Sequence, residues 1–508
     1  LGSVNSVSQG GTGYATYAMA NLPLKQGVAA LRLVANKRKD PGYIDNLGTG
    51  RKDANVVNAE GMRLLLAFKP STDFDLTALY MRQRSRQDDG SAISPDPSRL
   101  EISTPTASTV DSVFDLTSLQ ANLNLGSLRL TSITGYQTKR RDQDADFTRY
   151  QVPDFSMSTD YGPYPGVTSA INVERRHSNT VSQEFRLAPQ QAGAVNWLAG
   201  LSHQRVSFYR TQQNIWPGTN DPANAPNDVV WDTLRTGTAT ENAVFGDVDV
   251  KATDKLNIGI GARYFQTQVK FVRSQPATLF GGAANTPLET SESGTTPKLS
   301  ARYQFTPQTS VYALASRGYR FGGINTRQSL PYRSDSLWNY ETGLRLAPAA
   351  GVTLDVSVFY LDWKDVQIST ADSAGFIVIS NVEKAKSTGL EAALSWRPSG
   401  TLSLTASAAY TRAITDSPFR AATGKIVPVG SNLPGTARLQ ASADATLAFD
   451  GPAGTAGRFS TLLSYVGERT PEIGSARVLP AYTTLDMRLS FQLGSWQLSA
   501  FAQNLADK

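Results

Sequence analysis

Apolar and polar residues alternate along the segment 256–264 with a period of two. One face carries Leu256, Ile258, Ile260, Ala262 and Tyr264, and the other carries Asn257, Gly259, Gly261 and Arg263. The same layout recurs in 128–136, 354–360 and 402–410. Alternating segments of about ten residues, apolar outside and polar inside, are typical of a membrane-spanning barrel. The pattern therefore predicts an all-β fold, a transmembrane antiparallel β-barrel.

Segments with this period occur about 21 times, with ends uncertain by two to four residues. We expect strands at 1–9, 13–23, 28–38, 60–69, 74–86, 113–124, 127–140, 179–188, 196–210, 238–251, 256–272, 295–305, 309–320, 337–347, 352–368, 384–396, 402–414, 435–449, 457–468, 481–493 and 496–505.

The connecting segments alternate between short and long. Pro70–Asp73 and Thr306–Gln308 are short, whereas Arg141–Ser178 and Thr211–Gly237 are long. Outer-membrane barrels have short periplasmic turns and long extracellular loops, so the pattern also gives the orientation. Interfacial aromatic rings are then expected at the extracellular ends of strands, at Tyr80, Tyr136, Tyr264, Tyr360, Tyr410 and Tyr465. A second ring is expected near the periplasmic ends, at Phe68, Trp396, Phe449, Phe491 and Trp496.

The odd number of strands has a consequence for closure of the barrel. An open strand edge is not tolerated in lipid, and single-chain bacterial barrels have an even number of strands. The sequence ends at Asn504–Lys508, directly after the last expected strand. We therefore expect one closing strand beyond this sequence, about 22 in total, with 1–508 forming a single barrel domain.

Composition narrows the class of protein further. The 508 residues are 40% hydrophobic and 18% charged, and no apolar run reaches the length of a spanning helix. Cysteine is absent and there are two histidines, His177 and His203, so we expect no disulfide framework, metal site or catalytic triad. The net charge of +6 is not gathered in a basic helix or sheet motif, which argues against nucleic-acid binding. We expect neither enzymatic activity nor a cofactor.

Charged residues of both signs occupy the polar face of the expected strands. The principal positions are Arg63, Arg129, Glu184, Arg186, Arg263, Glu341, Arg345, Glu391 and Arg438. Charges this dense are costly in a dry core, so they indicate a wet lumen or a polar domain that fills it. Two interpretations stay open, namely that these residues pair with one another and with a plug, or that some of them guide cargo.

Several segments resemble the barrel of TonB-dependent outer-membrane receptors. They are Gly10–Tyr14 with Asn21–Leu24, Leu31–Leu33 with Gly42–Asn46, Gly61–Pro70, Ser316–Gly323, Tyr340–Arg345, Asn381 with Ala385 and Gly389–Glu391, and Phe501–Lys508. Together, and in this order, they span the chain. The family also has an N-terminal plug domain, a TonB box before it and a final strand with a terminal aromatic residue, which this sequence does not contain.

The resemblance implies active uptake through the outer membrane of a Gram-negative bacterium, driven by TonB with ExbB and ExbD acting on the plug. The default cargo is a ferric siderophore, with a vitamin, heme or an oligosaccharide as alternatives. Outer-membrane lipid, lipopolysaccharide and a surface lipoprotein or other accessory subunit are further possible partners. The rival functions are a passive diffusion pore, which would have about 16–18 strands, and a structural or adhesive barrel.

Aromatic and cationic residues at the expected mouth are the candidates for cargo binding. They are Tyr161, Tyr164, Trp216 and Trp231 in long loops, and Arg317, Tyr319, Arg320 and Phe321 where a strand leaves the membrane. Such residues could grip aromatic or anionic cargo by stacking and ion pairing. The competing interpretation is that they pack loops together or belong to the interfacial girdle.

Overall fold

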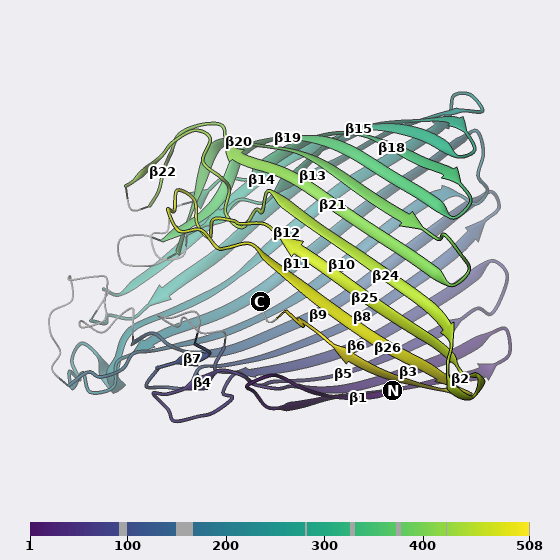
Figure 1. Cartoon of the computed structure of the whole chain (residues 1–508). Coiled ribbons are helices and arrows are strands. Elements are labelled where there is room, and N and C mark those ends of the chain that lie inside the picture. Colours follow the sequence, from purple (N-terminus) through teal and green to yellow (C-terminus); the bar gives the residue numbers. More distant parts are fainter. Residues whose placement is uncertain are drawn as a thin grey trace.

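The computed structural model describes residues 1–90, 99–148, 166–279, 282–325, 331–371, 377–422 and 424–506. They form a single sheet of 21 antiparallel strands, in which each strand pairs with the next one along the chain. Figure 1 shows this sheet curled into a barrel, with tight turns at one end and long loops at the other. The predicted fold and strand number are confirmed.

The 21 barrel strands have the following bounds: β1 Gly2–Ser6, β2 Thr12–Lys25, β3 Ala29–Asp40, β5 Val57–Phe68, β6 Phe74–Asp88, β8 Thr109–Leu125, β9 Leu128–Asp146, β10 Ile171–Pro189, β11 Val195–Ile215, β12 Val229–Lys251, β13 Leu256–Gln275, β14 Ala284–Thr306, β15 Thr309–Arg320, β18 Asp335–Ala349, β19 Val352–Ala371, β20 Ile377–Trp396, β21 Leu402–Thr415, β24 Leu439–Asp450, β25 Ala456–Val466, β26 Tyr482–Leu493 and β27 Trp496–Ala502.

Small elements occupy the connecting segments. Three two-stranded pairs form from β4 (Asp45–Asn46) with β7 (Glu101–Ile102), β16 (Gly323–Ile324) with β17 (Pro331–Tyr332), and β22 (Phe419–Arg420) with β23 (Ile426–Val427). Two short 3-10 helices are η1 (Pro226–Asp228) and η2 (Pro452–Gly454). In the part of the chain that the structure describes, no helix has the length and apolarity needed to traverse a lipid bilayer.

Several strands extend further toward the long loops than the sequence pattern predicted. β10 begins at Ile171 rather than 179, β12 at Val229 rather than 238, and β14 at Ala284 rather than 295. The added residues lie beyond the apolar band, next to the long loops, and some of them, such as Val230 and Arg235 of β12, are buried there. Alternation disappears there, because no side of the strand has to be apolar, and backbone pairing continues without it.

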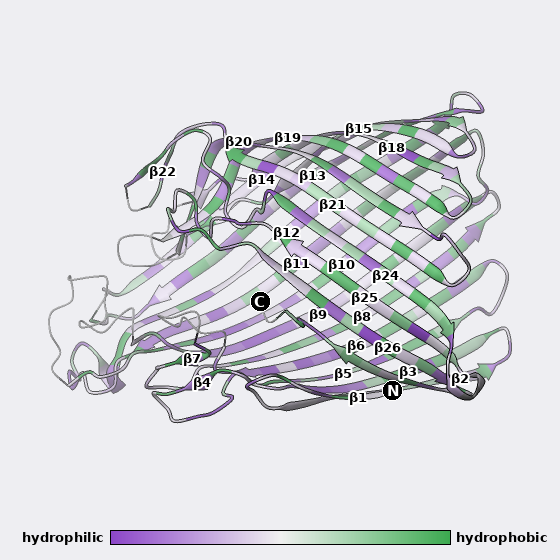
Figure 2. Cartoon of the chain, viewed as in Figure 1, coloured by the Kyte–Doolittle hydropathy of each residue, from purple (hydrophilic) through white to green (hydrophobic). Residues whose placement is uncertain are grey.

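The two faces of the wall differ as the alternation predicted. Ile260 and Leu201 are 61% and 58% exposed although both are large and apolar, as expected for side chains that meet lipid. Figure 2 shows bands of apolar and polar residues alternating along the strands. Tyr136, Tyr264 and Tyr410 are also exposed on this outer face, as the predicted aromatic girdle requires.

The first and last strands of the sheet each pair with one other strand. Within the described residues, β1 pairs with β2 and β27 pairs with β26, and no register joins β1 to β27. The predicted closing strand lies beyond this sequence and stays a prediction.

Candidate functional site

The lumen face of the barrel carries paired charges. Arg129 lies 3.0 Å from Asp75, and Arg345 lies 2.5 Å from Asp355. Glu184 and Arg186 form a third ion pair along β10. The expectation that lumen charges pair with one another is confirmed for these residues.

The remaining predicted lumen residues have weaker or different partners. The hydroxyl of Tyr312 donates a hydrogen bond to Glu341, and Arg63 contacts the sulfur of Met81 at 3.7 Å. Glu391 lines a hollow of about 630 Å³ on the wall formed by β18 to β25. Arg438 directly precedes β24, at the long-loop end of the barrel, and its contact with a plug stays a prediction.

One cluster joins aromatic and charged side chains on the lumen face, and we call it the Tyr319 cluster (Ser202, Glu241, Arg263, Phe265, Tyr319 and Phe321). The ring of Tyr319 stacks on that of Phe265, with centroids 3.5 Å apart and planes 4° from parallel. The Tyr319 hydroxyl donates a hydrogen bond to Glu241 at 3.2 Å. Phe321 meets the Tyr319 ring edge-on at 5.3 Å and is 40% exposed.

A partly buried cation, Arg263, completes the Tyr319 cluster. Arg263 forms an ion pair with Glu241, and its Nη2 donates a hydrogen bond to Ser202 at 3.1 Å. The guanidinium also lies 5.5 Å from the ring centroid of Phe245. The cluster therefore combines a stacking surface, a carboxylate and a cation, and its exposed part is Phe321.

Backbone geometry explains how Tyr319 reaches this face. The ladder between β14 and β15 ends at the pair Lys298–Ser316, so β15 is no longer tied to β14 beyond that point. Gly294 of β14 leaves room for the ring of Phe265, since a Cβ atom there would lie 2.7 Å from the ring. Both features allow the two rings to stack across β14.

The neighbours of Tyr319 point elsewhere. Arg320 forms an ion pair with Asp335, bonds the carbonyl oxygen of Gln367 at 3.0 Å and lies 5.8 Å from the ring centroid of Trp363. In the strand register, Arg317 is directly opposite Trp338 of β18. Two residues away on the same face, Ala315 is opposite Tyr340, which is exposed. The register therefore puts Arg317 on the same face as the girdle, and its contact with cargo stays a prediction.

Two tryptophans expected to contact cargo are buried. Trp216 is 1% exposed and packs with Val167, Ala170, Ala225 and Val230 in a small core formed by the long loops and the start of β12. Trp231 is 7% exposed. Trp231 lies in β12, opposite Asn214 of β11, and is not in the loop core. Burial of an apolar ring is more favourable than its exposure at the mouth, so neither tryptophan offers a binding surface. Tyr161 and Tyr164 lie outside the described residues.

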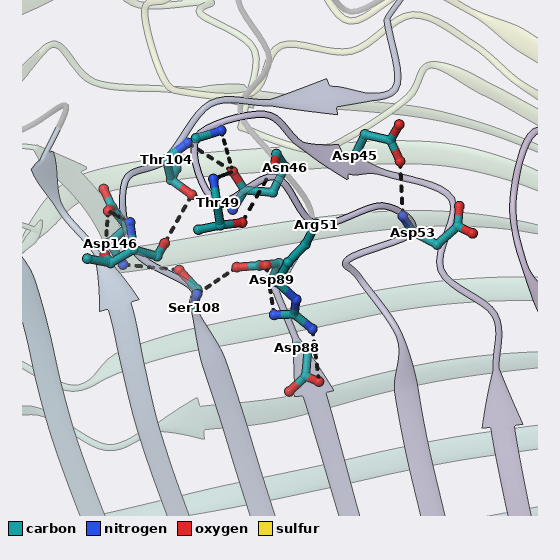
Figure 3. Close-up of polar contacts among 12 residues, drawn as sticks. Asp45, Asn46, Thr49, Arg51, Asp53, Asp88, Asp89, Thr104, Ser108 and Asp146 are labelled. Atoms are coloured by element: carbon teal, nitrogen blue, oxygen red, sulfur yellow. Dashed lines mark hydrogen bonds and ion pairs between the residues drawn. The ribbon is translucent and has the colours of Figure 1, made fainter.

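Polar contacts hold two other loops together, at the end of the barrel near β4 and β7 (Figure 3). Asn46 and Asp89 are each 1% exposed. Asn46 donates to Thr104 at 2.9 Å, and Asp89 accepts from the backbone of Ser108 at 2.7 Å and pairs with Arg51 at 3.2 Å. These contacts join the segment 44–55 to Asp89 and to the segment 99–108 at the rim.

Glu241 and Phe265 were missed as site residues by the sequence analysis. Their inward parity was readable from the alternation, since Phe265 lies two residues after Arg263. Their contact with Tyr319 was not readable, because it depends on where one strand ladder ends. Among the described residues, no group of three or more histidine or acidic side chains is arranged to hold a metal ion.

The sequence from 63 to 505 matches the family TonB dependent receptor-like, beta-barrel. The chain belongs to this family. Its members are outer-membrane β-barrels, and the family resemblance and the predicted localisation are therefore confirmed.

Curated relatives cover part of the chain. The pesticin receptor of Yersinia enterocolitica is 28% identical over 240 residues, which is 46% of this chain and 34% of that protein. The pesticin receptor of Yersinia pestis is 27% identical over the same length. The match thus spans about a third of the length of these relatives.

Solved structures share the fold of this TonB-dependent receptor barrel over its whole length. The ferric yersiniabactin uptake receptor FyuA from Yersinia pestis superposes with a TM-score of 0.83 at 20% identity, covering 100% of this chain and 74% of that one. The ferripyoverdine receptor of Pseudomonas aeruginosa gives 0.71 at 14% identity, covering 100% and 67%. The copper transporter OprC gives 0.73 at 14% identity, covering 100% and 73%.

Proposed function

We propose that this chain is the barrel of a receptor that binds a ferric chelate at the cell surface. The complete receptor would import the chelate to the periplasm with energy from TonB, ExbB and ExbD. The observation that carries the proposal is the Tyr319 cluster, because it presents a stacking surface beside a carboxylate and a cation on the lumen face. The names of the structural neighbours, which include receptors for ferric yersiniabactin and ferripyoverdine, support a ferric cargo.

A passive pore is the rival from another class. Passive porins have about 16–18 strands around a water-filled channel, whereas the described residues of this chain already form 21. The family membership also favours energised uptake over diffusion. Vitamin, heme and oligosaccharide cargoes remain alternatives within the same mechanism.

Uptake of radioactive iron tests the proposal. The full-length gene is expressed in an iron-starved strain that lacks its own copy, and ⁵⁵Fe uptake is measured with a panel of ferric chelates. We expect saturable uptake of at least one chelate that stops when TonB is deleted or the proton gradient is collapsed. Uptake that rises linearly with concentration and ignores TonB would indicate a pore instead.

The contribution of the Tyr319 cluster has its own measurement in the same assay. Phe321→Ala removes the exposed ring and leaves the buried contact between Tyr319 and Glu241 in place. Loss of one stacking contact of about 0.5–1.5 kcal/mol should raise the half-saturating concentration several-fold. Tyr209→Ala, which removes an exposed ring from the outer face of β11, should leave it unchanged.

A further inference from the structure

A row of arginines crosses five consecutive strands, from β9 to β13, near the long loops. The strand registers pair them one to the next, in the order Arg141, Arg176, Arg210, Arg235 and Arg273. We call these five residues the arginine row. Neighbouring strands lie about 4.8 Å apart, so the row covers about 19 Å of the wall.

The arginine row faces the lumen. On β13, Arg273 shares its side of the strand with Arg263 and Phe265, whereas Tyr264 and Ile260 have the opposite side and are exposed. Directly paired residues on neighbouring strands point to the same face of the sheet. The other four arginines, which are paired one to the next up to Arg273, therefore also face the lumen. Outer-membrane lipid is therefore not the partner of the row.

The charge of the row is poorly balanced by its surroundings. The adjacent row toward the loops consists of Gln143, Glu174, Gln212, Thr233 and Gln275. The adjacent row toward the membrane consists of Lys139, Ser178, Phe208, Gly237 and Phe271. Among the described residues of these three rows, Arg141, Arg176, Arg210, Arg235 and Lys139 face one carboxylate, that of Glu174, which pairs with Arg176 and with Arg210 at 2.6 Å. Like charges directly opposite on neighbouring strands are destabilising, so the row is costly without an anion.

Arg235 is the most unusual member of the row. It is 4% exposed, and its Nε and Nη1 atoms have no hydrogen-bond partner among the described residues. Burial, together with the charges of Arg210 and Arg273, lowers the pKa of Arg235 to about 9, which leaves it protonated at neutral pH. A buried guanidinium with two unsatisfied nitrogen atoms is rare in native proteins and indicates a missing acceptor.

The position of the row suits an entry site. On β12, Arg235 lies six residues beyond Glu241 toward the loops, which is about 20 Å along the strand. Asn214 and Trp231 pair above the row, and the loop core around Trp216 follows them. Cargo that enters from the loops would therefore meet the arginine row before the Tyr319 cluster.

We propose that the arginine row binds the oxyanions of its cargo, so that this receptor selects polyanionic chelates, with carboxylates as the recognised groups. The guanidinium fork matches a planar carboxylate in two parallel hydrogen bonds, and neighbouring forks can share a ligand that carries several carboxylates. The aromatic rings of Phe208 and Phe271, 6.2 Å apart, form the lower border of this site. That the bound anion is cargo rests on the proposed function; that the row binds polyanions does not.

Anion binding is measured on the purified full-length receptor in detergent. Citrate is the probe, with sodium chloride at matched ionic strength as the reference, and the readout is the melting temperature and the calorimetric Kd. We expect citrate to raise the melting temperature by several degrees beyond chloride. Arg235→Gln and Arg141→Gln should each weaken citrate binding about tenfold, since each removes a charge-assisted hydrogen-bond pair.

Matched controls separate a specific site from general surface charge. Both control residues lie on the outer face: Arg140 is next to Arg141 of the row on β9, and Arg205 lies five residues from Arg210 on β11. Arg140→Gln and Arg205→Gln lower the net charge by the same amount and should leave citrate binding unchanged. Equal losses in both pairs of variants, or no citrate effect beyond that of chloride in the wild-type receptor, would overturn the proposal.

Cells carrying the same variants connect the row to transport. Uptake of ⁵⁵Fe is compared for ferric citrate and for a neutral ferric trihydroxamate. If the row selects cargo, the wild-type receptor should take up ferric citrate in preference to the neutral chelate. Arg235→Gln should lose this preference. If the purified receptor binds citrate but the cells take up no iron, the anion site is supported and the proposed function is refuted.

Discussion

Tyr319 illustrates how a single side chain can leave the pattern of its strand. Strict alternation places it on the outer face with Arg317, yet its ring stacks on Phe265 at 3.5 Å and its hydroxyl reaches Glu241. The ring stacking and the charge-assisted hydrogen bond together make this position more stable than one in which the ring is exposed on the outer face. One residue thus joins β15 to β12 and β13 across the intervening strand.

Replacing Tyr319 by phenylalanine measures the hydrogen bond alone. The stacked ring is kept, and loss of the bond to a carboxylate should reduce stability by about 1.5 kcal/mol. The melting temperature of the purified receptor reports the change. Tyr209→Phe on the outer face, where the ring is 44% exposed, should have no effect. A similar loss in both variants would contradict the geometry.

At the scale of elements, strands and loops obey different rules. Most of the wall buries little and owes its order to backbone pairing. Two small cores form where the long loops meet strand ends, one around Trp216 and one in which Val427 and other loop residues pack on Val382 of β20. The long loops gather at one end of the barrel (Figure 1). The long loops should therefore be able to unfold locally while the barrel stays folded.

Trp216→Ala tests this separation. The cavity left by a fully buried ring should cost the loop core about 3–5 kcal/mol. Limited proteolysis should then cut the 211–229 segment much faster, while the melting temperature of the barrel stays unchanged. Tyr209→Ala, on the same hairpin but exposed, should cleave at the wild-type rate. Loss of the whole barrel in Trp216→Ala would argue against independent loop cores.

The two faces of β19 permit a matched comparison. Val356 shares the outer face with the exposed Val358 and Tyr360, and Ser357 points to the lumen with Glu391. Val356→Lys should cost about 2–4 kcal/mol because it places a charge near the middle of the bilayer, and Ser357→Lys should cost much less. Refolding into lipid vesicles with urea titration measures both. Equal costs would reverse the assignment of faces.

At the scale of the whole molecule, the direction of the barrel follows from its loops. Strands such as β13 and β19 rise from tight turns and end in long segments, and every small sheet lies at the long-loop end (Figure 1). Family members reside in the outer membrane, so the long loops face the outside and the turns face the periplasm.

The absence of cysteine makes this orientation easy to measure. Ala476→Cys lies in an exposed part of a long loop, and Gly400→Cys lies in a tight turn where an added Cβ meets open space. A membrane-impermeant maleimide applied to intact cells should label Ala476→Cys alone. Both variants should react after the outer membrane is permeabilised. The opposite labelling pattern would invert the barrel.

Much of the fold was available from the sequence. The period of two placed all 21 strands, and Ile260 and Leu201 face outward as the alternation required. Burial of Trp216 and Trp231 could not be foreseen, because loop packing depends on segments far apart in sequence and carries no periodic signal. The same holds for Tyr319, whose contact depends on the end of a strand ladder.

The sequence by itself determined that this chain forms a barrel, which residues face lipid and which end faces outward, since alternation and loop length are local properties. Only the tertiary structure decided which lumen residues meet. Arg141 and Arg273 are 132 positions apart in the chain, and the register of five strands aligns them in one row. Register is a relation between strands, and no single segment encodes it.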